Sequence, residues 1–164
     1  MKIQTESELY GPVRAWLQEL LARRYRGHEV LALDTSRTRL STVVAQRGLQ
    51  ARFPQAGVWD IQADITAFIL GKESHLAFVE CKRGPITLKD VGQLLVYSLV
   101  ARPLLAILLS VEEPSDALRT LLVTYGRYDI LEYDRKGSRI RIVQWDPARR
   151  AVLHAATLPP GEHV

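Results

Sequence analysis

Three short apolar segments constrain the fold of this chain more than any other feature. They read ADITAFIL at residues 63–70, HLAFVECK at residues 75–82 and LLAILLSV at residues 104–111. Each has the length of a strand and carries apolar residues on both faces, which is typical of a sheet that helices cover on both sides. The sequence therefore predicts an α/β fold.

Helical spacing of apolar residues predicts the covering helices at residues 7–25 and 88–101. Thr87 and Asp90 have the spacing of a capping box at the start of the second helix. The further elements that we expect are a strand at 28–34, a helix within 39–49, a short helix at 115–122, a hairpin in which 128–134 pairs with 138–146, and a segment at 150–158 that turns back along it. This order predicts a three-layer αβα sandwich around a mixed central sheet, with a C-terminal β-hairpin extension.

The 164 residues suit a single domain, with no linker that would divide it. We expect a core at about 6–134, a β-extension at about 138–158 and a disordered tail at 159–164. No apolar run approaches the roughly 18 residues of a membrane span, and the N-terminal residues have no apolar signal-peptide core. A single cysteine excludes an internal disulfide and fits a reducing cytoplasm.

The chain is basic and rich in arginine, with 17 Arg, 5 Lys and a net charge of +4. The guanidinium fork binds phosphate through two hydrogen bonds at once, so this composition favours a nucleic-acid partner. The charge is mild, and an ordinary solvated basic surface is the alternative.

Charged residues stand where two of the apolar segments end. Side chains alternate along a strand, so Glu80 and Lys82 share one face and lie about 7 Å apart. If the two segments form a hairpin with Leu70 opposite Leu76, Asp64 falls opposite Lys82 and diagonal to Glu80. Pairing Leu70 with His75 instead would place Asp64 opposite Cys81.

Two carboxylates and a lysine at the edge of a sheet have a definite chemical use. Carboxylate oxygens bind hard cations such as Mg²⁺, which lowers the pKa of bound water and stabilises charge on a phosphate under attack. The lysine orients the water or neutralises the developing negative charge. An ion-pair network without catalysis is the alternative, since the tripeptide alone is weak evidence and Asp134 and Lys136 repeat it.

Asp64 in ADI, followed by Glu80 and Lys82 in VECK, resembles the signature of the PD-(D/E)xK nuclease superfamily, which includes restriction endonucleases and Holliday-junction resolvases. The resemblance covers about residues 6–134 and implies a restriction-endonuclease-like αβββαβ core. Ala63 stands where the family has proline, a position that does not bind metal. Asp60 competes with Asp64 as the first acid and ranks second.

The resemblance also implies roles for residues outside the motif. The backbone carbonyl of Cys81 and an acid of the first helix, Glu8 or secondly Glu6, would join Asp64 and Glu80 as metal ligands. Gln93 would support catalysis by Asp64, Glu80 and Lys82. Lys89 and Tyr97 share the stripe of Gln93 at i−4 and i+4. The expected nucleic-acid contacts are Arg83, Lys89, Arg37 and Arg39.

The first functional hypothesis is a Mg²⁺-dependent endonuclease or exonuclease that hydrolyses DNA phosphodiester bonds, with Mn²⁺ as a possible substitute and RNA as an alternative substrate. By analogy with the family, a homodimer is expected. The second hypothesis is a nuclease-like module that binds nucleic acid without cutting it, within a larger complex. The third is a structural subunit that binds no nucleic acid.

Overall fold

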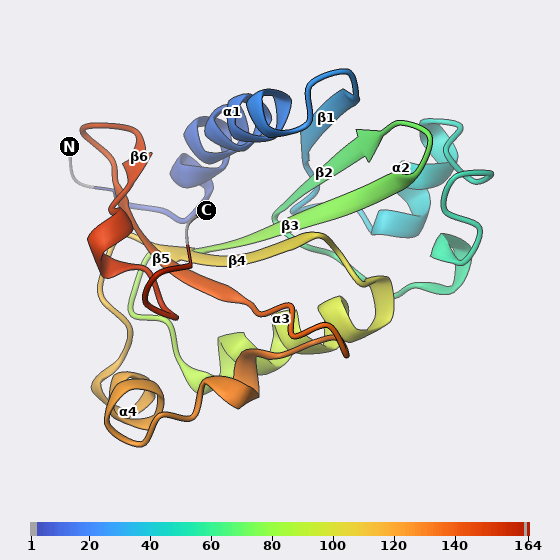
Figure 1. Ribbon diagram of the computed structural model, residues 1–164. Helices are drawn as coiled ribbons and strands as arrows, with labels where there is room; N and C mark the ends of the chain where they lie inside the picture. The colour runs from blue at the N-terminus through green and yellow to red at the C-terminus, as the bar shows by residue number, and fades with distance from the viewer. Residues whose placement is uncertain (1–2, 163) are drawn as a thin grey trace.

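The computed structural model describes residues 3–162 and 164. The fold is α/β, and its helices and strands follow the predicted order through α4 (Figure 1). The bounds are α1 Ser7–Arg24, β1 Glu29–Asp34, α2 Leu40–Gln46, β2 Ile65–Leu70, β3 Ser74–Lys82, α3 Leu88–Ala101, β4 Leu105–Ser110, α4 Asp116–Arg119, β5 Arg141–Asp146 and β6 Ala151–Val152. Among the described residues, no helix is long and apolar enough to cross a membrane.

The six strands form one mixed sheet in the order β1-β2-β3-β4-β5-β6. The pairs β1–β2, β2–β3 and β5–β6 are antiparallel, whereas β3–β4 and β4–β5 are parallel. Helix α3 makes the crossover between β3 and β4, as a parallel pair requires. All six residues of β4 are buried, which agrees with the apolar run of that segment.

Helices lie on both faces of this sheet, as Figure 1 shows with α1 above it and α3 and α4 below. Side chains that alternate along the strands enter two separate cores. Ala77, Val79 and Cys81 of β3 pack with α1 on one face. Leu76 and Phe78 of the same strand pack with α2, α3 and α4 on the other.

Helix α3 begins and ends where the sequence predicts. Thr87 and Asp90 form the expected capping box, in which Asp90 Oδ2 accepts hydrogen bonds from the Thr87 N–H and hydroxyl, each at 2.8 Å. Arg102 ends the helix in the left-handed conformation with φ 49°, immediately before Pro103. The buried side of the helix consists of Val91, Leu94 and Ser98.

The C-terminal part differs from the expected hairpin. Residues Tyr128–Leu131 form a 3-10 turn, and one bridge, Glu132 with Arg139, is all that remains of the pairing across residues 135–138. Strand β5 instead joins the main sheet beside β4, because Ile142 and Val143 are buried in the two cores and need a covered position. The C-terminal strands are therefore part of the sheet and not a separate extension.

The last residues pack against this sheet. Leu158 forms a bridge with Ile142, and Val164 is buried in the α1 core. Glu162 forms ion pairs with Arg139 and Arg141, each at 3.6 Å. These contacts hold the described part of the segment in which we expected disorder.

Candidate active site at the edge of the sheet

Asp64, Glu80 and Lys82 meet at one edge of the sheet. Asp64 immediately precedes β2, and Glu80 and Lys82 lie in the last three residues of β3. Both carboxylates are nearly covered, since Asp64 is 9% exposed and Glu80 3%. Because β3 and β4 are parallel, their carboxyl ends, Lys82 and Ser110, lie side by side at this edge.

The register that brings the acids together differs from both registers considered above. Leu70 lies opposite Ser74, and Ile65 opposite Val79. A shift of two residues keeps each side chain on its face, so the carboxylates still converge. Continuing this register by one residue places Asp64 opposite Glu80 and not opposite Lys82.

A backbone hydrogen bond fixes the position of Asp64. Its Oδ2 accepts the N–H of Cys81 at 2.8 Å in a buried position. The N–H of Cys81 lies between the two motif residues of β3, so this bond ties the acid of one strand to the acid-x-Lys of the next. The thiol of Cys81 points into the α1 core and is fully buried. Burial and the nearby Asp64 raise the pKa of this thiol well above its usual value, which disfavours a nucleophilic role.

Lys82 lies between two acids. Its Nζ is 3.9 Å from Oε2 of Glu80 and 3.8 Å from Oε1 of Glu6. Burial alone would lower the pKa of Lys82, but the carboxylates of Glu6 and Glu80 outweigh burial and raise the pKa. The side chain is therefore a fixed positive charge at the edge of the sheet.

At Glu80 a raised pKa favours the neutral form of the side chain, whereas at Lys82 it favours the charged form. Burial, followed by the charge of Asp64, raises the pKa of Glu80 to about 8, although Lys82 acts to lower it. Two carboxylates forced together in a covered position repel one another when both are ionised. A bound cation would relieve this repulsion.

Glu6, the residue immediately before α1, and not Glu8 within the helix, is the acid that reaches the site. The carboxylate of Glu8 turns back to Thr5, whose N–H and hydroxyl donate to Oε1 at 2.9 and 3.0 Å. These bonds lower the pKa of Glu8, a fully exposed side chain. The Thr5-x-x-Glu8 spacing is that of a capping box, a signal present in the sequence.

Tyr10 is a site residue that sequence reasoning missed. Burial, the charge of Asp64 and hydrogen bonding to it raise the pKa of the Tyr10 phenol. Tyr10 of α1 lies four residues after Glu6, the residue at the start of the helix, so the two side chains lie on the same side. The spacing of four residues between Glu6 and Tyr10 was the signal in the sequence from which Tyr10 could have been identified.

Helix α3 contributes Gln93, whose Nε2 lies 3.5 Å from Oε1 of Glu80. This distance is at the long limit of a hydrogen bond. Of the other two residues of this stripe, Lys89 is exposed, as Gln93 is, and Tyr97 packs partly buried against the core below the sheet.

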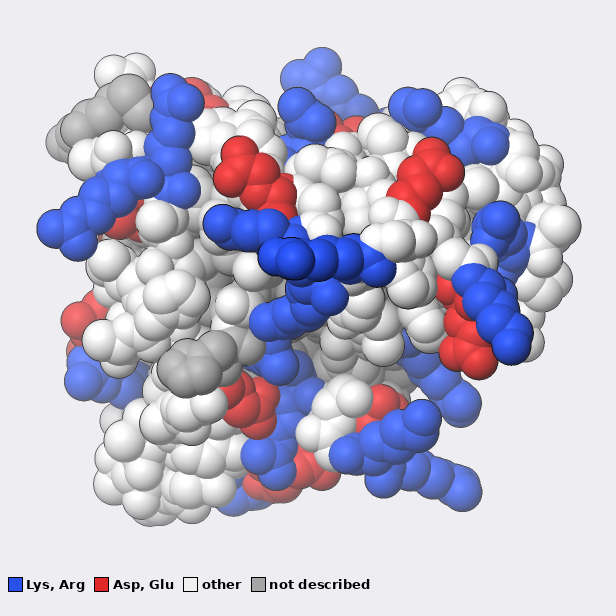
Figure 2. Space-filling model, turned by 45° about the horizontal axis from the view of Figure 1, so that its top comes forward, with Lys and Arg blue, Asp and Glu red and all other residues white. Residues whose placement is uncertain are grey.

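The predicted nucleic-acid contacts lie around the site without forming one cluster. Arg83 donates to the backbone oxygen of Gln4 at 2.6 Å. Arg39 forms an exposed ion pair with Asp60 at 3.3 Å, which places the competing acid Asp60 at the surface. Figure 2 shows basic side chains in a band across the middle of one face, with acidic side chains among them.

A hollow of about 310 Å³ adjoins the site on the side of β1. Tyr10 lines this hollow and also interacts with Asp64. The remaining lining is polar and includes the guanidinium of Arg37, together with Ser7, Asp34, Ser36 and Thr38. Its hydroxyls and one arginine are hydrogen-bond donors of the kind that contact phosphate, and the carboxylate of Asp34 offsets the charge of the arginine.

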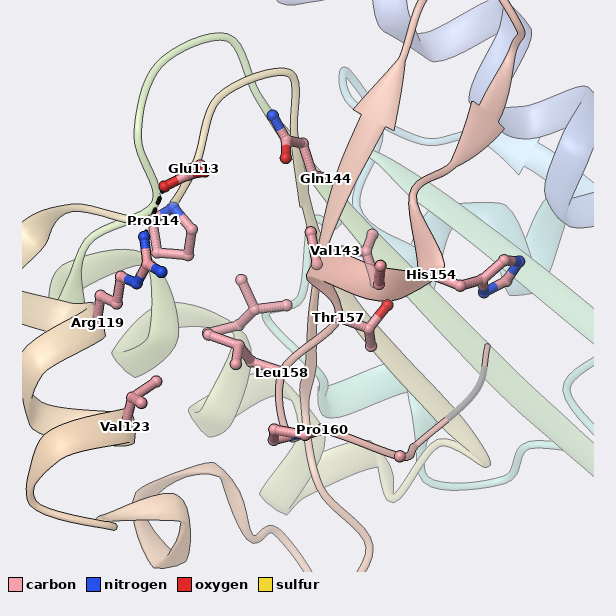
Figure 3. Close-up of a pocket in the computed structure, with 14 residues that line it drawn as sticks. Glu113, Pro114, Arg119, Val123, Val143, Gln144, His154, Thr157, Leu158 and Pro160 are labelled. Carbon is pink, nitrogen blue, oxygen red and sulfur yellow. Dashed lines mark hydrogen bonds and ion pairs between the residues drawn. The ribbon is translucent and has the colours of Figure 1, made fainter.

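A second hollow, of about 360 Å³, lies between α4, β5 and the 3-10 turn His154–Ala156 (Figure 3). Val123 and Leu158 supply apolar walls, and the ion pair of Glu113 with Arg119 at 2.8 Å lies at its rim. It shares no lining residue with the acid and lysine cluster.

Asp64 and Glu80 fit a magnesium ion in chemical type. Mg²⁺ is held in proteins by one or two carboxylates with water completing the shell. Among residues 3–162 and 164, no group of three or more His, Cys, Asp and Glu side chains is arranged to hold a metal ion. A site here would thus rest on the two carboxylates and on backbone oxygen.

Comparison of the chain with family models, curated proteins and solved structures found no match. The function must therefore be argued from the geometry of the site.

Proposed function

We propose that this chain is a metal-dependent nuclease of the PD-(D/E)xK type, acting on DNA phosphodiester bonds. The observation that carries the proposal is the convergence of Asp64 and Glu80 through the Cys81 N–H, with Lys82 beside Glu80. The element order and the helices on both faces support the three-layer sandwich with an αβββαβ core that the resemblance implies.

Each residue of the site has a role in this proposal. Asp64, Glu80 and the backbone carbonyl of Cys81 would hold Mg²⁺, or Mn²⁺ in its place. The cation would supply charge stabilisation and a more acidic water. Lys82 neutralises negative charge that develops on the phosphate, because its own charge is secured by neighbouring acids. The Cys81 N–H and Tyr10 hold Asp64 in place.

Three further residues act around this centre. Glu6, at the start of α1, orients Lys82 and is the first-helix acid at the site in place of Glu8. Gln93 orients Glu80 from α3. Arg37 contacts the phosphate next to the scissile one through the polar hollow. Arg83, Arg39 and Lys89 contribute weaker phosphate contacts at the exposed rim.

The test is a cleavage assay on plasmid, linear duplex, four-way junction and single-stranded DNA, with RNA alongside, in Mg²⁺, Mn²⁺ or EDTA. Lys82→Ala should lower the rate at least about 100-fold, the usual effect of removing one group that stabilises transition-state charge. Lys72→Ala is the matched control, since Lys72 is exposed in the turn between β2 and β3. Circular dichroism confirms that both variants fold. Equal cleavage by both variants would refute the assignment.

A non-catalytic nucleic-acid-binding module is the second candidate. Lys82 already forms ion pairs with Glu6 and Glu80, so part of the negative charge of the site is compensated without a cation. This candidate predicts salt-sensitive binding of the same DNA panel in EDTA, with no cleavage in either metal.

A further inference from the structure

Arg141, the first residue of β5, carries two buried hydrogen-bond donors that lack an acceptor. Its Nε and Nη1 are covered by protein, and neither has a hydrogen-bond partner among the described residues. A buried donor that has given up its bonds to water is costly when nothing replaces them, and more so in a charged group. The guanidinium of Arg141 therefore indicates a place for a negatively charged acceptor.

Glu162 supplies the charge of such an acceptor but not its close hydrogen bonds. Its Oε2 lies 3.6 Å from Nε of Arg141, and its Oε1 lies 3.6 Å from Nη1 of Arg139. Hydrogen bonds between guanidinium groups and carboxylates have lengths of about 2.7–2.9 Å. The carboxylate thus lies between the two arginines without approaching either of them closely.

Arg139 shows the contrast within one side chain. Its Nε and Nη2 donate to Oε1 of Glu132 at 3.0 and 2.6 Å, which are ordinary lengths for such a pair. Its Nη1, in contrast, lies at the longer distance from Glu162. Glu132 is therefore the structural partner of Arg139, and Nη1 of Arg139 remains available, together with Arg141, for another acceptor.

We propose that Arg139 and Arg141 form a binding site for a terminal phosphate group, and that Glu162 occupies this site until a phosphate displaces it. The guanidinium group is the side chain best suited to phosphate. A terminal phosphate has three free oxygens and a charge of about −1.5 to −2 near neutral pH, whereas a carboxylate has two oxygens and one charge. The phosphate therefore offers more acceptors and more charge to the two arginines than Glu162 does.

The same comparison separates a terminal phosphate from a phosphate within a nucleic-acid strand. A phosphodiester has two free oxygens and one negative charge, as the carboxylate of Glu162 has. Exchange of Glu162 for a phosphodiester therefore gains neither an acceptor nor charge. The chemistry favours inorganic phosphate or a phosphate monoester, such as the phosphorylated end of a strand.

A rotation of the Glu162 side chain is enough for the exchange. That side chain is 30% exposed, so it already borders water. The backbone around it is anchored, because Leu158 forms a bridge with Ile142 and Val164 is buried in the core beside α1. The side chain of Arg141 is 23% exposed, so a ligand reaches it once the carboxylate has turned away.

This phosphate site is separate from the candidate active site. Arg141 lies in register with Ile107 and Val79, two residues of the core beside α1. Lys82 lies three residues beyond Val79 and two strands from Arg141, about 14 Å away between Cα atoms, with its side chain on the other face of the sheet. Phosphate binding here needs neither a metal nor cleavage, so the proposal does not depend on the proposed nuclease function.

The test is isothermal titration calorimetry with inorganic phosphate in EDTA at constant ionic strength. Glu162→Gln removes the competing charge and keeps the shape of the side chain, so it should bind phosphate at least about tenfold more tightly than the wild type. Arg141→Lys, introduced into the Glu162→Gln protein, keeps the positive charge but loses the planar fork, and should weaken binding at least about tenfold.

Glu113→Gln and Lys136→Gln are the matched controls. Glu113 forms an exposed ion pair with an arginine elsewhere on the surface, and Lys136 is exposed in the turn before β5. Each should bind phosphate within about twofold of the wild type, because exposed charges are screened by salt. Circular dichroism confirms that every variant folds.

A second titration identifies the source of the phosphate. A short oligonucleotide with a 5′-phosphate and the same oligonucleotide without it are each added to Glu162→Gln. Tighter binding of the phosphorylated form assigns the site to the end of a nucleic-acid strand. Binding of inorganic phosphate, with no difference between the two oligonucleotides, assigns it to free phosphate.

Three outcomes would overturn the proposal. The first is a Glu162→Gln protein that binds no phosphate at about 10 mM, which would mean that water satisfies the buried donors of Arg141. The second is a gain of affinity in Glu113→Gln equal to that in Glu162→Gln. The third is an Arg141→Lys variant that binds phosphate as tightly as its Glu162→Gln parent.

Discussion

The raised pKa of Glu80 makes the stability of the metal-free protein depend on pH. Glu80 is buried beside Asp64, and its pKa in the folded protein is about 8, against an ordinary value of 4.5. Between these two values the folded protein holds a proton that the unfolded chain releases. The free energy of unfolding therefore falls as the pH rises through this window, which is the reverse of an acid held ionised by a salt bridge. Replacement of Glu80 by Gln removes the titration and keeps the shape of the side chain.

The size of the effect follows from the two pKa values. Within the window between them, each step of one pH unit lowers the free energy of unfolding by about 1.4 kcal/mol. Raising the pH from 5 to 8 should therefore cost the wild type roughly 3–4 kcal/mol relative to Glu80→Gln. The side chain of Glu80 is 4% exposed, so solvent screening reduces this value little. At pH 5 the two proteins should have similar stability, because Glu80 is then protonated in the fold.

Urea unfolding in EDTA at pH 5, 6, 7 and 8 measures this difference. Glu19→Gln is the control, since Glu19 is exposed on α1 and its loss should leave the slope of the wild type unchanged. If the stability of Glu80→Gln falls with pH in parallel with that of the wild type, then Glu80 does not carry a raised pKa and the covered acid pair is wrongly described.

Two further outcomes follow from the same structure. Mg²⁺ at a fixed concentration should raise the melting temperature more at pH 8 than at pH 6, because binding requires ionised carboxylates. An equal rise at both pH values would contradict binding at this site. So would a rise that the Asp64→Asn variant retains. Thr87→Ala should lower the free energy of unfolding by about 1 kcal/mol through loss of the capping box at α3, whereas Thr124→Ala, at the exposed end of the turn after α4, should change it by less than about 0.5 kcal/mol.

The sequence predicts the elements of this fold well where periodicity and capping agree. Helix α3 begins after the capping residue Thr87 and ends before Pro103, as expected, because both signals are local. Strand β4 is a continuous apolar run and is buried throughout. The segment Tyr128–Leu131 is different, since its apolar residues fill the core below the sheet from a 3-10 turn, and alternation alone does not distinguish that from a strand.

The register between β2 and β3 shows why part of the site was beyond sequence reasoning. Registers that differ by two residues bury the same side chains, so the apolar pattern favours neither. The turn decides between them, and Leu70 pairs with Ser74 across three residues. Gly71 in that turn lies against the ring of His28, where a Cβ would have no room. Such a contact between distant residues leaves no local signal.

The choice between Glu6 and Glu8 also depends partly on a local contact and partly on a distant one. Both Glu6 and Glu8 were candidates, and the sequence does contain the reason for separating them. Thr5 three residues before Glu8 forms a local capping pair, which occupies that carboxylate. The sequence does not show that Lys82, 76 residues further on, lies next to Glu6 in the fold.

Helix α3 extends this reasoning to the surface of the protein. Its sequence has more apolar residues than a helix needs to cover one side of a sheet, but composition does not say which of them remain outside. The fold uses Val91 and Leu94 and leaves Leu88, Val96 and Val100 exposed. These exposed side chains lie along one side of the helix, where their contact with water is unfavourable. Gln93 of the same helix lies toward Glu80, so the exposed apolar side chains and the candidate site share one structural element.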